Sequence, residues 1–154
     1  AFLDHTLKSS SIFDYRINGR SVGEIGIEGA YAGHFGVPVI AVTGDEATAA
    51  EARELLGEVE CAVVKTAVGR NRASCVSIPE AHRRIREAVS RAVTNAGQYK
   101  PFQPDLPATL ELTLYRADMA DVYQSTQARL AGVERVDART VRARIEQYTD
   151  IRVL

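Results

Sequence analysis

The 154-residue chain is long enough to form a compact fold with a continuous hydrophobic core. Its net charge of −1 argues against binding to nucleic acid or to an anionic membrane surface. No apolar run approaches the roughly 20 residues that a membrane-spanning helix needs. The two cysteines, Cys61 and Cys75, lack disulfide or CxxC spacing and favour reduced thiols in the cytoplasm.

The two ends of the sequence are apolar. The first six residues contain no initiator Met and do not have the pattern of a signal peptide, and Phe2 and Leu3 run directly into His5. The last four residues, 151–154, also end apolar. We therefore expect the chain to begin inside a domain and to stop inside structure at its other end as well.

Strand-like and helix-like segments alternate in the first half of the chain. Near-alternation of polar and apolar residues predicts a strand over Ile12–Ile17, and Asn18-Gly19 is a strong signal for a tight turn after it. The further elements that we expect are a glycine-rich helix over 21–35, an apolar strand over 37–42, a helix over 47–56 and a strand over 60–65.

The second half continues the alternation. Pro79 fits the first turn of a helix over 77–95, and a proline-rich connector follows over 100–107. After it we expect a strand over 109–115, a helix over 117–130, a short extended piece over 133–136 and a last helix over 140–148. This order predicts an α/β fold in which helices are layered on a mixed, partly parallel sheet.

The three histidines differ in their surroundings. His82 lies among arginines on a helix, which is typical of a solvated face, and His34 suits the C-terminal end of a helix dipole. His5 has polar neighbours in a loop, as a general base, a nucleophile or a metal ligand needs. Composition alone does not decide between these roles and an ordinary surface histidine.

Two carboxylates are candidates, and each also has a structural role that its neighbours explain. Glu24 completes a capping box with Ser21, and similar boxes occur at Thr43-x-x-Glu46 and Ser77-x-x-Glu80. Asp45 follows Gly44 at the end of a strand, where it either caps the next helix or lies in a ligand-binding loop. The basic loop over 69–72 is by default solvated surface.

Several segments together resemble the M55 peptidase family of D-aminopeptidases. The most specific is the stretch Ile-Asn-Gly-Arg-Ser-Val-Gly-Glu over 17–24, and the order and spacing fit over roughly 3–95. The other matching segments lie at 3–6, 25–26, 32–33, 36–39, 43–46 and 62–65.

The resemblance implies a zinc-dependent aminopeptidase that removes an N-terminal D-residue, typically D-Ala, from short peptides. It implies that His5 is a catalytic nucleophile or general base and that Glu24 is a metal ligand, in a complete enzyme with two zinc ions. The family's other ligands, an Asp-x-Glu and two histidines, lie upstream of the His5 motif. Asp4, Glu28 and Gly29 depart from the family pattern.

We therefore expect residues 1–45 to form a catalytic segment and 46–154 the remainder of an M55-like C-terminal portion, with the upstream metal-binding segment absent. The isolated chain is then expected to be inactive. The expected partners are short peptides containing D-amino acids and further copies of the chain in a homo-oligomer, with no nucleic acid and no membrane. The alternative is a catalytically incomplete family member that acts as an oligomerisation or binding module, with helix 22–35 as its packing face.

Overall fold

The computed structural model describes residues 1–151, with the side chains of all of them except 126–131. These residues form two compact units. Unit 1 consists of Ala1–Asp4 and Phe35–Phe102, and unit 2 consists of His5–His34 and the chain from Gln103 onward. The first crossing between the units therefore falls between Asp4 and His5. Of the apolar C-terminal residues, Ile151 is completely buried, and 152–154 lie outside the described residues.

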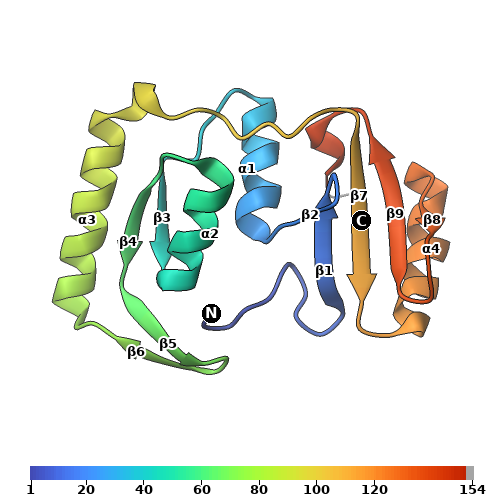
Figure 1. The fold of residues 1–154 in the computed structure, drawn as a ribbon, viewed down its shortest axis with the longest axis horizontal. Helices are drawn as coiled ribbons and strands as arrows, with labels where there is room; N and C mark the ends of the chain where they lie inside the picture. The colour runs from blue at the N-terminus through green and yellow to red at the C-terminus, as the bar shows by residue number, and fades with distance from the viewer. Residues whose placement is uncertain (152–154) are drawn as a thin grey trace. The chain divides into compact units, whose positions relative to one another are not determined.

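Unit 2 contains a five-stranded antiparallel sheet with the order β2-β1-β7-β9-β8 (Figure 1). Its first two strands form a hairpin that turns at Asn18 and Gly19, whose φ angles of 51° and 79° suit a tight two-residue turn. The strands are β1 (Ile12–Ile17), β2 (Arg20–Ser21), β7 (Ala108–Leu114), β8 (Glu134–Arg135) and β9 (Thr140–Ile145).

The two faces of this sheet differ in chemistry because apolar and polar residues alternate along β7. Leu112 is completely buried and lies opposite Tyr15 of β1 and Val141 of β9, which are also buried. On the other face Glu111 lies opposite Arg142 and accepts from its guanidinium at 2.6 Å. One face therefore forms the core of unit 2 and the other carries cross-strand polar pairs.

The helices of unit 2 are α1 (Glu24–His34), α4 (Ala117–Ala131) and the short 3₁₀ helix η2 (Tyr148–Asp150). Helix α4 contacts β7, β8 and β9, and α1 contacts η2. The close packing that we expected from the small residues of α1 is present, since three of its glycines are buried together with Ile27 and Ala30. The Gln103 side chain donates to the Gly33 carbonyl at 2.6 Å and so joins the two chain stretches of the unit.

Unit 1 is built on a parallel pair of strands, β3 (Ala41–Gly44) and β4 (Glu60–Val63), which α2 (Glu46–Leu56) connects (Figure 1). Helix α3 (Ile78–Thr94) and α2 both contact these two strands. The unit is completed by the hairpin of β5 (Lys65–Gly69) and β6 (Arg72–Cys75) and by the 3₁₀ helix η1 (Ala96–Gln98).

The fold class expected from the sequence, α/β with partly parallel strand pairing, is confirmed, although the parallel pair and the antiparallel sheet are separate. The helix expected over 140–148 is wrong. Its first six residues form β9, because apolar residues at every second position pair with the apolar face of β7. The strand expected over 37–42 begins later, at Ala41, and the basic loop over 69–72 is the turn of a hairpin that the sequence did not reveal.

Candidate functional site

His5 is an exposed residue of the loop that precedes β1. The backbone on either side of it is unusual, because Leu3 and Leu7 have φ angles of 53° and 55°. This left-handed region is uncommon for residues other than glycine, asparagine and aspartate. The Lys8 amide donates to the Thr6 carbonyl at 2.6 Å across Leu7, which is the hydrogen bond of a γ-turn. His5 therefore lies between two constrained backbone positions.

Glu24 is the first residue of α1, and its side chain is exposed. The capping box expected with Ser21 is wrong, because Ser21 belongs to β2 and its hydroxyl donates to the Asp14 carboxylate. Glu24 is instead the first residue of the helix, and its negative charge is favourable at this end of the helix dipole. Glu24 therefore does not take part in the capping box that the sequence suggested. Both His5 and Glu24 belong to unit 2.

The other two sequence boxes also fail to form. Thr43 lies in β3, and Glu46 accepts instead from the Thr66 hydroxyl at 2.7 Å. Ser77 occupies the cap position of α3 without a side-chain hydrogen bond, while Glu80 pairs with the two arginines one turn later. These glutamates lie close to basic or hydroxyl side chains, which compete successfully with the backbone amide that a capping box uses.

Asp45 is the true cap of α2. It is 3% exposed, and its Oδ1 accepts from the Thr48 amide at 2.9 Å. Its Oδ2 accepts from the Phe2 amide at 2.7 Å. The hydrogen bond from Thr48, followed by that from Phe2, lowers the pKa of Asp45 to about 2. Gly44 is needed beside it, since a Cβ there would lie 2.9 Å from the Thr48 side chain.

Zinc does not fit the residues described for this chain by themselves. Within residues 1–151 no group of three or more His, Cys, Asp or Glu side chains is close enough together to hold a metal ion. A catalytic zinc site usually takes three protein ligands and leaves one position open. Glu24 could supply at most a part of such a site, and the other histidines do not complete it.

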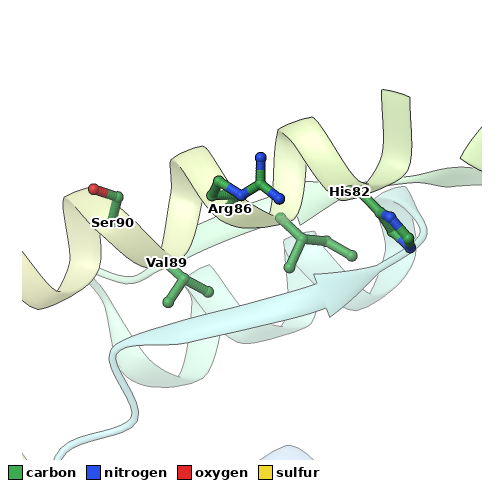
Figure 2. Close-up of a pocket in the computed structure, with 5 residues that line it drawn as sticks. His82, Arg86, Val89 and Ser90 are labelled. Atoms are coloured by element: carbon green, nitrogen blue, oxygen red, sulfur yellow. The ribbon is translucent and has the colours of Figure 1, made fainter. Parts of the chain in front are cut away.

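The remaining histidines lie on helices and are exposed. His34 is in the last turn of α1, and His82 is on α3 of unit 1, as expected from the sequence. An open pocket of about 470 Å³ lies along α3. Figure 2 shows four of the residues that line it, His82, Arg86, Val89 and Ser90. All its lining residues come from this one helix: His82, Ile85, Arg86, Val89 and Ser90. The pocket therefore contains neither His5 nor Glu24.

A family model described as Peptidase_M55, D-aminopeptidase, matches residues 1–154. The chain belongs to the M55 peptidase family. A curated D-aminopeptidase from Bacillus subtilis (strain 168) is 36% identical to it over 127 residues, which cover 79% of this chain and 46% of the relative. The resemblance expected from the sequence is thus confirmed.

A solved structure of the same family has the same fold. It is the Zn-dependent D-aminopeptidase DppA from Bacillus subtilis, described as a self-compartmentalizing protease, with a TM-score of 0.87 and 26% identity. The match covers 97% of this chain and 53% of DppA. The M55 chain described here therefore spans about half the length of the relatives that it matches.

The structure adds contacts that reading the sequence missed. Asp45 binds the backbone of Phe2, which is 43 positions away, and the Leu3 amide donates to the Arg70 carbonyl at 2.7 Å. The Gly44-Asp45 pair indicated a helix cap or a ligand-binding loop at this position, but it did not indicate that Asp45 binds the Phe2 amide. In addition, no described helix is both long and apolar enough to cross a membrane.

Proposed function

We propose that this chain is the C-terminal portion of a zinc-dependent aminopeptidase that removes N-terminal D-amino acids, of the D-Ala type, from short peptides in the cytoplasm. The observation that carries this proposal is the match of the D-aminopeptidase family model to all 154 residues. The Zn-dependent relative, DppA, supports zinc as the cofactor. Residues 1–45 would form the catalytic segment of this portion, and 46–154 its remainder.

In this proposal His5 is the catalytic residue of the chain, as nucleophile or general base at the scissile carbonyl. Its exposed side chain can meet a substrate, and an imidazole can accept a proton near neutral pH. Glu24 is one ligand of the metal site, and its exposed carboxylate has no capping role that would oppose this. The other ligands of a site with two zinc ions have to come from outside residues 1–151.

Substitution in the complete enzyme tests the two assignments. His5→Ala should abolish release of D-Ala from D-Ala-D-Ala, whereas His82→Ala, which changes an exposed histidine on α3, should leave the rate unchanged. Glu24→Gln should lower both the zinc content and the rate, and Glu58→Gln is its matched control at an exposed position. Wild-type turnover in His5→Ala would refute the role of His5. A panel of D- and L-aminoacyl substrates then tests the preference for D-residues.

The self-compartmentalizing description of DppA also supports a homo-oligomer for the complete protein. Sedimentation of the complete enzyme measures this directly, and a monomer would contradict it. We expect neither nucleic acid nor membrane among its partners.

One observation favours a second candidate function, a family member that serves as an oligomerisation or binding module. The described part of the chain, residues 1–151, lacks a cluster of three metal-ligating side chains. Zinc content and intact mass of the protein purified from its natural source distinguish the two. A heavier protein with bound zinc supports the enzyme, and a metal-free protein of this length supports the module.

A further inference from the structure

Residues 1–4, here called the strap, are held to unit 1 through their backbone. The Phe2 amide donates to Asp45 Oδ2 at 2.7 Å, and the Leu3 amide donates to the Arg70 carbonyl at 2.7 Å. Asp45 lies at the start of α2, and Arg70 lies in the turn between β5 and β6. Two separate elements of unit 1 therefore bind consecutive residues of the strap.

Side chains add to this attachment. Arg70 Nε lies 3.1 Å from Asp4 Oδ1, and one of its terminal nitrogens donates to the Asp4 carbonyl at 3.2 Å. The Lys65 ammonium lies 5.3 Å from the centre of the Phe2 ring, within the range of a cation–π contact. The Arg70–Asp4 pair is largely exposed, so its contribution is small. The hydrogen bond to Asp45 is part-buried, and the Asp45 side chain itself is buried.

Asp45 uses its two oxygens for different partners. Oδ1 accepts from both the amide and the hydroxyl of Thr48, each at 2.9 Å, and Oδ2 accepts from Phe2. This carboxylate is charged at neutral pH, and the hydrogen bonds from Thr48 and Phe2 lower its pKa because they favour the charged form. Hydrogen bonds to a charged acceptor are roughly twice as strong as those between neutral groups. The buried side chain of Asp45 therefore both caps α2 and holds the strap.

The backbone on both sides of His5 is also constrained. Leu3 is in the left-handed region, as is Leu7 beyond His5, and such conformations persist only where surrounding contacts impose them. Behind Leu7, the Lys8 carbonyl accepts from the Ile12 amide at 3.0 Å, which ties the loop to β1. The three residues between Leu3 and Leu7 include His5, which follows the strap directly.

We propose that Asp45 is a positioning residue for His5, because it holds the Phe2 amide and thereby fixes the strap from which His5 emerges. This inference rests on the proposed function in its catalytic part, since it assumes that His5 acts on the substrate. The holding of the strap by Asp45 is independent of that assumption. In this proposal Asp45 acts through the strap and not on the substrate.

The holding of the strap is tested first in the 154-residue chain. Asp45→Ser keeps a good helix cap, because serine and aspartate are about equally effective at this position, but one short hydroxyl cannot also reach Phe2. Amide exchange of Leu3 should then accelerate about tenfold, while that of Thr48 stays as in the wild type. Unchanged Leu3 exchange with an intact Thr48 amide would overturn the proposal.

A second variant covers the case in which α2 frays in Asp45→Ser. Asp45→Asn offers one oxygen to Thr48 and places an NH₂ group, which cannot accept, where Oδ2 faces Phe2. Asp45→Asn should accelerate exchange of the Leu3 amide as Asp45→Ser does. Arg70→Ala is the control for the exposed pair, because it removes the contact to Asp4 but retains the carbonyl that accepts from Leu3. Its effect on Leu3 exchange should be clearly smaller, and an equal effect would assign the strap to Arg70 instead.

The effect of Asp45 on catalysis by His5 is tested in the complete enzyme. Asp45→Ser should lower kcat at least tenfold and move the pH profile of kcat, since small displacements of a catalytic group cost large factors in rate. A mere loss of folded enzyme would lower kcat without moving that profile. If His5→Ala is inactive and Asp45→Ser has wild-type kcat and pH profile, the positioning role alone fails. If His5→Ala is active, the proposed function of His5 fails, whatever Asp45→Ser does.

Discussion

The Tyr15 hydroxyl donates a hydrogen bond of 2.6 Å to the Ile151 carbonyl, so that β1 is joined to a turn 136 positions later. Both residues are buried, and burial raises the pKa of Tyr15 far above its ordinary value. Tyr15→Phe removes the donor and leaves the carbonyl without this partner in the core. We expect the free energy of unfolding, measured by urea denaturation, to fall by about 1–2 kcal/mol.

Tyr148→Phe is the matched control. Tyr148 is 2% exposed, and its hydroxyl has no hydrogen-bond partner among the side chains and backbone that the structure describes. Removing an unsatisfied buried hydroxyl should leave the stability unchanged or raise it. Equal losses in Tyr15→Phe and Tyr148→Phe would show that the 2.6 Å hydrogen bond contributes nothing specific.

Asp45 should make the fold sensitive to acid. Its pKa is about 2 in the folded chain and 3.8 ordinarily, so its contribution is fully present above about pH 4 and is lost as the pH falls through 2. This difference corresponds to about 2 kcal/mol. Urea denaturation between pH 5 and pH 2, a range that contains the ordinary value and reaches the lowered one, should show a steeper loss for the wild type than for Asp45→Asn. Parallel curves for the two proteins would contradict the assignment.

Leu112 lies at the centre of the apolar face of the five-stranded sheet and is completely buried. Leu112→Ala leaves a cavity between Tyr15 and Val141 on the neighbouring strands. We expect it to lower the free energy of unfolding by about 2–5 kcal/mol. Val122→Ala, at a position of α4 that is 62% exposed, should change stability by less than about 0.5 kcal/mol. A small effect at Leu112 would mean that this face is not the core.

Local sequence signals predicted the parts of the fold that depend on near neighbours. The strand Ile12–Ile17 and the turn at Asn18-Gly19 agree with the structure, because alternation and turn chemistry are properties of adjacent residues. The sequence predicts a helix over the segment that forms β9, whose alanine and arginines favour helices in isolation. Its pairing with β7, about thirty positions earlier, overrides that preference.

The candidate site was less predictable from local sequence signals than the strands and turns were. His5 and Glu24 stood out only through the family motif, because the ordinary structural explanation from their neighbours was the stronger one for each residue taken alone. The structure removed one of these explanations when it placed Ser21 in β2. The contact of Asp45 with Phe2 had no sequence signal, since the two residues are 43 positions apart and the acceptor meets a backbone amide. Such contacts follow from the folded chain and not from a motif.

The 154-residue chain should bind zinc poorly in the absence of any further segment. Because residues 1–151 contain no group of three potential ligands, the chain should not retain zinc after gel filtration. Glu24→Gln should therefore change the zinc content of the isolated chain little, whereas the same substitution should lower it in the complete enzyme. Elemental analysis of both proteins measures this. Stoichiometric zinc in the isolated chain that is lost in Glu24→Gln would mean that the chain completes the site by itself, for example by pairing with a second copy.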